Sequence, residues 1–252
     1  MPNDPDTRPD PLYIPPAGDV PAQLFVLLHG ESAGPEQLLD LVAAVRQAFP
    51  RAAILQPQGP FGGDARRRWI AQAEPAPRDY VGLIAQAGAA LADEVAGWQA
   101  QHGLGGEQTA LVGFSEGAAV ALEAVCSVPG LAGRALLFST RFATLPASVP
   151  PTVTLHLLHG AQDRVAPAEQ ARQVHERLAQ LQGDVTLDVA SGVGHNLHAA
   201  LIRQAIVRLQ TCVPLRSWQS AQDAARLEVD EYSAVEPPEG DFPPEDPRDD
   251  KA

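Results

Sequence analysis

The feature that most constrains the fold of this chain is a regular alternation, over residues 22–211, between short apolar runs and longer segments with helical spacing. Short apolar runs are typical of buried strands, whereas apolar positions three and four residues apart predict helices. The predicted strands are 22–29, 52–55, 109–113, 134–139, 152–158 and 185–189, and the predicted helices are 35–49, 80–101, 115–127, 166–182 and 195–211. This alternation predicts an α/β fold with a mostly parallel twisted sheet, helices on both faces and a site at the carboxyl ends of the strands.

The two ends of the chain differ from this region in composition. Of the 24 prolines, seven lie in residues 1–21 and six in residues 213–252, and this last stretch carries 11 acidic against four basic residues. Segments of this kind bury little apolar surface. We therefore expect a flexible N-terminal segment (1–20), one α/β domain (21–215) and an acidic, proline-rich extension (216–252), mostly disordered after a short helix. The extension is interpreted either as a solvated tail or as a docking segment for a basic partner.

Net charge and cysteine content exclude several classes of protein. The formal charge is −13 at pH 7 and the isoelectric point is about 4.8. We therefore expect neither nucleic acid binding nor stable membrane association, because phosphate backbones and anionic membranes repel such a chain. No apolar run approaches the roughly 18 residues of a membrane-spanning helix, and the first residues do not resemble a secretory signal. Two cysteines form neither a disulfide framework nor, with these histidines, a zinc site. We expect a cytoplasmic protein without metal or cofactor.

The strongest local motif is Gly-Phe-Ser-Glu-Gly at 113–117. It follows an apolar run and opens an alanine-rich helix, which is the setting of a nucleophile elbow. In such an elbow the chain turns so sharply that the serine is strained and only glycines leave room on either side. The amino terminus of the following helix favours negative charge that develops at the serine. The motif predicts that Ser115 is a nucleophile, and the alternative is a glycine-flanked serine that caps the helix.

A serine hydroxyl needs a base, usually a histidine, to accept its proton. In enzymes with such an elbow the order along the chain is serine, acid, histidine. This order leaves five candidates: His156, His159, His175, His195 and His198. His156 lies within a predicted strand and His175 within a predicted helix, so both are interpreted as structural. His195 follows a Ser-Gly-Val-Gly loop after the last predicted strand, from which it can reach back over the sheet. We predict that His195 is the base, with His198 as the alternative.

The acid that orients this histidine should lie on a loop after a strand, between the serine and the histidine. Asp163 meets this requirement, because an apolar run ends shortly before it and Gly160 turns the chain. A carboxylate there can accept from the Nδ1–H of the histidine, which fixes the tautomer and stabilises the imidazolium. The rivals are Asp184, which precedes its strand, and Asp188, which lies within it. We predict that Asp163 is the acid.

Acyl transfer also requires N–H donors for the oxyanion of the transition state. The residue after the nucleophile supplies one, so we predict the backbone N–H of Glu116. The second donor should come from the loop after an earlier strand, where Gly30 lets the chain fold back. We predict the backbone N–H of Glu31 as that donor. His29 is interpreted as a core imidazole that supports this loop rather than as a catalytic group.

Four separated motifs carry a resemblance to a known family: Leu-Leu-His-Gly at 27–30, Gly-Phe-Ser-Glu-Gly at 113–117, His-Gly-Ala-Gln-Asp at 159–163 and Gly-His at 194–195. The chain resembles the small lidless serine hydrolases that include acyl-protein thioesterases and bacterial carboxylesterase/phospholipase proteins. It is most similar to the bacterial cytosolic short-chain carboxylesterase branch. The resemblance covers roughly residues 20–220. It implies an α/β-hydrolase without a cap domain, a triad of Ser115, Asp163 and His195, no cofactor, and hydrolysis of carboxylic esters or thioesters.

Two positions depart from the family pattern. The residue after the nucleophile is usually glutamine, whereas here it is Glu116, and a charged carboxylate near the oxyanion would oppose the reaction. We hypothesise that its side chain turns away, is hydrogen-bonded to backbone N–H groups or is partly protonated. The oxyanion loop commonly reads His-Gly-x-Gly-Asp, whereas here it reads His-Gly-Glu-Ser-Ala-Gly at 29–34. The geometry of this loop therefore need not follow the family's.

The segment 57–78 is predicted as a long loop, because it lacks a secondary-structure period and is rich in Gly, Pro and Arg. Its apolar residues exceed what a solvated loop needs. In a protein without a cap domain such a loop would shape the acyl pocket, and the resemblance supports Trp69 as a substrate-binding residue. The alternative is that Trp69 packs beneath the loop.

The motifs and the resemblance together predict a serine carboxylesterase that hydrolyses small to medium carboxylic esters through an acyl-enzyme. One alternative is an acyl-protein thioesterase or lysophospholipase, which would need a long apolar channel. Another is a non-catalytic hydrolase fold that binds a ligand. The expected partner is a small-molecule ester substrate, and whether the chain forms a homodimer stays open.

Overall fold

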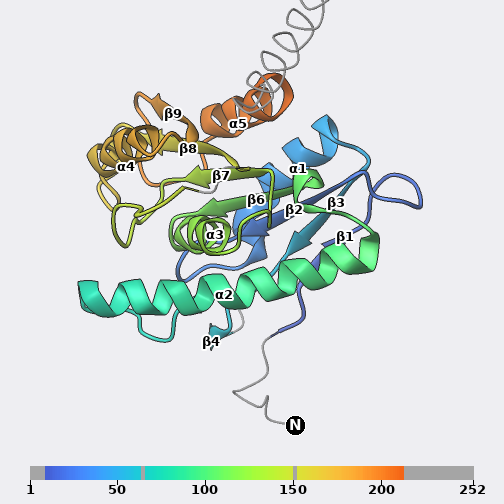
Figure 1. Ribbon diagram of the computed structural model, residues 1–252, viewed down its shortest axis with the longest axis horizontal. Coiled ribbons are helices and arrows are strands. Elements are labelled where there is room, and N and C mark those ends of the chain that lie inside the picture. Colours follow the sequence, from blue (N-terminus) through green and yellow to red (C-terminus); the bar gives the residue numbers. More distant parts are fainter. Residues whose placement is uncertain (1–8, 64–65, 150–151, 213–252) are drawn as a thin grey trace, which may run out of the picture. The chain divides into compact units, whose positions relative to one another are not determined.

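A mostly parallel sheet of seven strands forms the centre of the fold, with the strand order β1-β3-β2-β6-β7-β8-β9 (Figure 1). The computed structural model describes residues 9–63, 66–149 and 152–212. Strands β2 to β9 of this sheet pair in parallel, whereas β1 pairs with β3 antiparallel. The strands are β1 (Leu12–Ile14), β2 (Gln23–Leu28), β3 (Ala52–Gln56), β6 (Thr109–Phe114), β7 (Arg134–Phe138), β8 (Thr154–Gly160) and β9 (Asp184–Ala190). The predicted α/β fold with a mostly parallel sheet is confirmed.

Helices cover both faces of the sheet (Figure 1). Successive residues of a strand point to opposite faces, so Ile54 and Leu55 of β3 belong to different cores. The core that contains Ile54 is covered by α1 and α5, and the core that contains Leu55 is covered by α2, α3 and α4. The helices are α1 (Leu39–Ala48), α2 (Pro77–His102), α3 (Glu116–Ser127), α4 (Ala168–Gln180) and α5 (Ala199–Thr211), with short 3₁₀ helices η1 (Pro35–Leu38) and η2 (Gly106–Gln108).

Two boundaries near the site differ from the predicted ones. Strand β8 continues to Gly160 instead of ending at residue 158, because it stays paired with β9 over its whole length. The last helix begins at Ala199 instead of residue 195. Residues 195–198 therefore belong to the loop between β9 and α5, and His195 lies on a loop rather than on a helix.

The expectation that residues 1–20 are flexible is wrong for residues 12–14, which form the edge strand β1. Tyr13 of this strand stacks on Trp98 and His102 of α2, with ring centroids 5.0 and 5.4 Å apart. Composition misses this strand because the flanking prolines suggest a coil. An edge strand nevertheless tolerates proline at its ends, where no ladder hydrogen bond is lost.

The segment 57–78, which was predicted as a loop, contains an antiparallel hairpin of β4 (Phe61–Gly63) and β5 (Arg66–Arg68). These short strands consist mainly of glycine and arginine, so they show no alternation of apolar and polar residues. The Arg67 N–H donates to the Ala33 carbonyl at 3.0 Å. The hairpin is therefore hydrogen-bonded to the loop that follows β2.

The carboxyl ends of the parallel strands meet at one edge of the sheet, and the loops that follow them hold the predicted site residues. Glu31 follows β2, Ser115 follows β6, Asp163 follows β8 and His195 follows β9. Pairing of these strands in parallel brings positions that are up to 164 residues apart in sequence to this edge, since Glu31 and His195 both lie there.

All described residues belong to one unit, Met1–Cys212. The predicted extension, residues 216–252, lies outside the described residues. Within the described ranges, no helix is long and apolar enough to cross a membrane.

Candidate active site

Ser115 lies at a sharp turn between β6, which ends at Phe114, and α3, which begins at Glu116. Its φ of 55° and ψ of −114° form a conformation that is rare for a residue with a side chain. The glycines on either side are required sterically. A Cβ at Gly113 would lie 2.5 Å from the Ala118 Cα, and a Cβ at Gly117 would lie 2.3 Å from the carbonyl oxygen of residue 29. The backbone therefore forms the predicted elbow.

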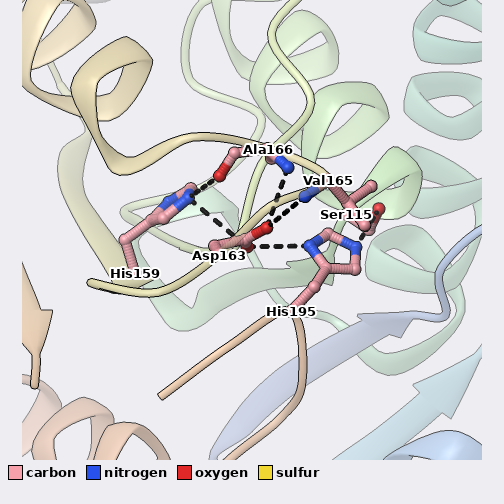
Figure 2. Close-up of polar contacts among 6 residues, drawn as sticks. All are labelled: Ser115, His159, Asp163, Val165, Ala166 and His195. Atoms are coloured by element: carbon pink, nitrogen blue, oxygen red, sulfur yellow. Dashed lines mark hydrogen bonds and ion pairs between the residues drawn. The ribbon is translucent and has the colours of Figure 1, made fainter. Parts of the chain in front are cut away.

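Ser115, His195 and Asp163 lie in a hydrogen-bonded row (Figure 2). The His195 Nδ1 lies 2.8 Å from Asp163 Oδ2, and the His195 Nε2 lies 3.0 Å from Ser115 Oγ. Because an ionised carboxylate only accepts, Nδ1 carries the proton and donates it. The unprotonated Nε2 then accepts from the serine hydroxyl. The structure thus brings together the three residues predicted from widely separated motifs, in the order that activates a serine.

Asp163 is held in place by the backbone that follows it. Its Oδ1 accepts from the N–H groups of Val165 and Ala166 at 2.9 and 2.8 Å (Figure 2). Burial alone raises the pKa of this carboxyl, but the hydrogen bonds from Ala166, His195 and Val165 outweigh burial and lower the pKa below its usual value. Asp163 therefore stays ionised and able to accept from His195 at neutral pH.

His159 is a neighbour of this acid to which the sequence analysis gave no role. Its buried Nε2 lies 2.6 Å from the Ala166 carbonyl and 3.5 Å from Asp163 Oδ2 (Figure 2), so Nε2 carries a proton and donates it. Burial lowers the pKa of His159, which keeps the ring neutral. The sequence feature that points to this neighbour is its position in the His-Gly-Ala-Gln-Asp motif, four residues before the acid. His159 thereby contacts the turn that presents Asp163.

Gly160 lets the acid loop approach the histidine loop. A Cβ at this position would lie 2.4 and 2.5 Å from the carbonyl oxygens of Val193 and Gly194. These are backbone atoms, which cannot yield as a flexible side chain can. The absence of a side chain at Gly160 therefore allows the loops of Asp163 and His195 to pack directly together.

The rival histidines and acids have other partners. The ring of His198 accepts from the Ala200 N–H and caps α5, and His156 is buried with its Nδ1 2.8 Å from Thr186 Oγ1. Among the acids, Asp184 accepts from Thr154, and Asp188 accepts from Gln204 and Arg208 of α5. None of these four contacts leads to Ser115.

The loop after β2 is stabilised by His29, as interpreted from the sequence. The ring is fully buried, and its Nε2 accepts from the Gly59 N–H at 3.0 Å. The proton is therefore on Nδ1, which donates to the Gly30 carbonyl at 2.7 Å. Burial lowers the pKa of His29, so the imidazole is neutral. The Gly30 N–H donates to the Gln37 side chain at 2.7 Å, which leaves Glu31 at the following turn.

The side chain of Glu31 forms an ion pair across the site. Its Oε2 lies 2.6 Å from Nη1 of Arg141, a residue of the loop after β7. The Arg141 guanidinium also lies 5.6 Å from the centroid of the Tyr80 ring, and the Tyr80 hydroxyl donates to the Arg141 carbonyl at 3.2 Å. The half-buried ion pair thus joins the loops after β2 and β7. The role of the Glu31 N–H as an oxyanion donor stays a prediction.

The carboxyl of Glu116 is fully buried and directed at a backbone N–H, one of the arrangements hypothesised above. Its Oε2 accepts from the Trp69 N–H at 2.8 Å, and its Oε1 has no hydrogen-bond partner among the described residues. Burial raises the pKa of Glu116 to about 7; Glu31 adds to this rise, whereas the Trp69 hydrogen bond, Arg141 and Arg68 oppose it. The side chain is therefore partly protonated at neutral pH.

Trp69 is only 2% exposed. Its indole Nε1–H donates to the His29 carbonyl at 2.8 Å, and its ring lies against the His29 imidazole with centroids 5.1 Å apart. These contacts support the interpretation that Trp69 packs beneath the loop rather than the one in which it binds substrate.

Comparisons with known proteins agree with this geometry. A profile of the phospholipase/carboxylesterase family matches residues 12–213. Esterase YpfH of Escherichia coli (strain K12) is 32% identical over 206 residues, which are 81% of this chain and 89% of that protein. The crystal structure of esterase PE8 has a TM-score of 0.72 at 26% identity and covers 82% of this chain and 100% of that chain.

A more distant structure, the Bacillus cereus carboxylesterase, shares the fold with a TM-score of 0.67 at 15% identity, over 78% of this chain and 91% of that chain. The fold is therefore that of an α/β-hydrolase, without a cap domain in the described residues. Since the family profile spans most of the chain and an esterase relative exceeds 30% identity, this protein belongs to the phospholipase/carboxylesterase family of α/β-hydrolases.

Proposed function

We propose that this protein is a serine carboxylesterase that hydrolyses small to medium carboxylic esters through an acyl-enzyme. The observation that carries the proposal is the hydrogen-bonded row from Ser115 Oγ through His195 to Asp163, at a strained elbow on the carboxyl edge of the sheet. Membership in a family with esterase relatives supports it. A protein that only binds a ligand would not need a serine that is hydrogen-bonded to a histidine and, through it, to an acid.

The first half of the proposed reaction is acylation. Ser115 Oγ attacks the ester carbonyl carbon as its proton passes to His195 Nε2. The carbonyl oxygen becomes an oxyanion and accepts from the N–H groups of Glu116 and Glu31. When the intermediate collapses, the bond to the alcohol oxygen breaks, His195 returns the proton to that oxygen, and the acyl group stays on Ser115.

The second half is hydrolysis of the acyl-enzyme. Water approaches from the side that the alcohol has left, and His195 takes one of its protons as the oxygen attacks the acyl carbon. The second oxyanion uses the same two donors. Collapse releases the carboxylic acid, and the proton on His195 returns to Ser115. Throughout the cycle, ionised Asp163 stabilises the imidazolium and keeps Nε2 directed at the serine.

The preference for small to medium esters follows from the resemblance of the sequence to the short-chain carboxylesterase branch. Initial rates on p-nitrophenyl esters with acyl chains from two to sixteen carbons test it. We expect kcat/KM to be highest for the short and medium chains and to fall for the longest. A maximum at sixteen carbons would favour the acyl-protein thioesterase or lysophospholipase alternative.

The serine mechanism is tested separately with a fluorophosphonate probe, which reacts with activated serines. We expect one label per wild-type chain, located on Ser115, and no label on Ser115→Ala. A wild-type chain that neither reacts with the probe nor hydrolyses any ester of the series would support the non-catalytic alternative instead.

A further inference from the structure

The two proposed oxyanion donors belong to different parts of the chain. The Glu116 N–H lies at the start of α3, and the Glu31 N–H lies in the loop after β2. The first N–H groups of a helix have no acceptor inside that helix, so the Glu116 N–H is free of an intrahelical partner. Oxyanion donors act only when their positions are held to a fraction of an ångström. Some contact must therefore keep these two segments at a constant separation.

Trp69 makes a hydrogen bond to each of the two segments. Its backbone N–H donates to the Glu116 carboxyl at 2.8 Å, and its indole Nε1–H donates to the His29 carbonyl, also at 2.8 Å. Both hydrogen bonds are buried, where water does not compete for the donors. The first acceptor, Glu116, is itself one of the proposed donor residues. The second acceptor, His29, lies two positions before the other proposed donor residue, Glu31.

The contacts around the His29 carbonyl leave little freedom for movement. The first turn of α3 packs on this oxygen so closely that a Cβ at Gly117 would lie 2.3 Å from it. On the other side of the loop, the hairpin segment donates from Gly59 to His29 Nε2 at 3.0 Å and from Arg67 to the Ala33 carbonyl at 3.0 Å. Gly59 and Arg67, which precede Trp69 in the chain, are thus hydrogen-bonded to residues on either side of Glu31.

We infer that Trp69 is a positioning residue that holds the two oxyanion donors at a fixed separation through its two buried hydrogen bonds. The inference rests on the proposed esterase function, since it concerns the oxyanion of that reaction. It also gives the buried carboxyl of Glu116 a purpose, because Oε2 is the acceptor for one of the two bonds. Trp69 acts through its neighbours and touches no reacting atom.

The test compares Trp69→Phe with Trp98→Phe. Trp69→Phe removes the indole N–H and keeps an aromatic ring. Trp98→Phe is the matched control, because the Trp98 ring stacks on Tyr13 of β1 and on His102 of α2, two residues without a part in the proposed reaction. For each variant, titration with the fluorophosphonate counts the functional serines, and kcat is expressed per titrated site. KM is measured as well. The last readout is the inhibition constant of a boronic acid, because its tetrahedral adduct with the serine mimics the tetrahedral intermediate.

We expect Trp69→Phe to lower kcat per titrated site about tenfold, less than the roughly hundredfold or greater loss when a donor is removed outright. KM should stay within twofold, and the boronic acid inhibition constant should rise by the same factor as kcat falls. A purely structural role would reduce the number of titrated sites and the melting temperature but leave kcat per site unchanged. Trp98→Phe should keep both kcat per site and the inhibition constant.

A second pair of variants acts on the other of the two hydrogen bonds, the one from the Trp69 backbone N–H to Glu116 Oε2, and serves if Trp69→Phe does not fold. Glu116→Gln keeps an oxygen acceptor for the Trp69 N–H, whereas Glu116→Met removes it at similar length. We expect the methionine variant to have a lower kcat per site and a weaker boronic acid affinity than the glutamine variant, with both quantities reduced by the same factor.

Two results would overturn the inference while the wild type remains active. One is unchanged kcat per site and boronic acid affinity in Trp69→Phe and Glu116→Met. The other is a rise in KM alone, which would restore Trp69 as a substrate-binding residue. A wild type without labelling and without ester hydrolysis would instead overturn the proposed function itself, and the inference with it.

Discussion

Ser115 holds a backbone conformation that costs of order 1–3 kcal/mol for a residue with a side chain, and only the surrounding contacts maintain it. Gly113 lets the start of α3 pack against β6, and Gly117 lets it pack against the end of β2, without a clash. The Ser115 N–H donates to the Phe138 carbonyl at 2.9 Å. At the residue scale the site thus combines a strained nucleophile with a histidine and an acid that are hydrogen-bonded in line with it. Substitutions of these three residues should change the rate of hydrolysis without unfolding the chain.

Ser115→Ala should lower kcat for p-nitrophenyl butyrate by roughly 10⁴-fold or more, because the nucleophile is removed. His195→Ala should have a similar effect, and Asp163→Asn a smaller one, since the neutral amide cannot stabilise the imidazolium. Steady-state rates and circular dichroism of each variant check this. His198→Ala is the control, and a loss of activity there with His195→Ala still active would contradict the assignment of the base.

The raised pKa of Glu116 predicts a stability that depends on pH. Its carboxyl titrates near 7 in the folded chain instead of near 4.5, so the folded state binds the proton more tightly than the unfolded state does. The unfolding free energy of the wild type should therefore fall as the pH rises between about 4.5 and 7. Glu116→Gln lacks this dependence. The variant should gain stability relative to the wild type across that window, by up to roughly 3 kcal/mol for the shift that burial causes.

Denaturant unfolding of both chains at pH 5 and pH 8 measures this difference. The same substitution should leave kcat within a few-fold of the wild type or raise it, because a charge that opposes the oxyanion is removed. The acidic limb of the kcat/KM profile should move to lower pH if His195 senses the carboxylate. A hundredfold loss of kcat with an intact fold would mean that the carboxylate itself takes part in the reaction.

At the scale of elements, the site depends on how closely α3 approaches the end of β2. Because a Cβ at Gly117 would lie 2.3 Å from the His29 carbonyl oxygen, the helix can occupy its position only when residue 117 is glycine. The same contact limits how closely the two segments that carry the proposed oxyanion donors approach each other, in addition to the Trp69 hydrogen bonds. The packing of α3 and the proposed stabilisation of the transition state therefore share this contact.

Gly117→Ala should push α3 away from the loop after β2. We expect a loss of about 1–3 kcal/mol in the unfolding free energy, as is usual when a group is forced into a filled space. The kcat should fall at least about tenfold, because displacement of a catalytic group by 1 Å costs up to roughly 100-fold. Gly97→Ala on α2 is the control: nothing lies within 4 Å of its Cβ position, so it should stabilise the helix by up to about 1 kcal/mol. Similar kcat values for the two variants would refute this role of Gly117.

At the scale of the whole molecule, the family profile ends at residue 213, close to the last described residue, Cys212. The residues of the proposed reaction all lie before this point. Composition predicts that the acidic, proline-rich stretch after it buries little apolar surface. We therefore expect hydrolysis to depend on the α/β-hydrolase unit alone.

A truncation that ends at Tyr232 should keep the melting temperature within about two degrees and kcat/KM within about twofold of the full chain, since no aliphatic run is removed. Thermal unfolding and ester hydrolysis of both chains check this. A large loss of either quantity would show that residues 233–252 contribute to folding or to the site.

The sequence by itself determined the alternation of strands and helices, the elbow, and the order of Ser115, Asp163 and His195, because these depend on periodicity and on turn residues that act over a few positions. Only the tertiary structure decided what supports them. Edge strand β1, which is three residues long with prolines on either side, and the hairpin β4–β5 of mainly glycine and arginine lack a local pattern, since such short strands form only against a partner.

Trp69 and Glu116 show the same division at residue scale. The sequence marked both positions but left open whether Trp69 binds substrate and where the Glu116 carboxyl points. Their hydrogen bonds join residues 40 and 47 positions apart, and His159 gains its role from a turn that only the folded chain closes. Hydrogen bonds between distant segments are decided by how the layers pack, because the entropic cost of closing a flexible loop rises only slowly with its length and so selects no particular pairing.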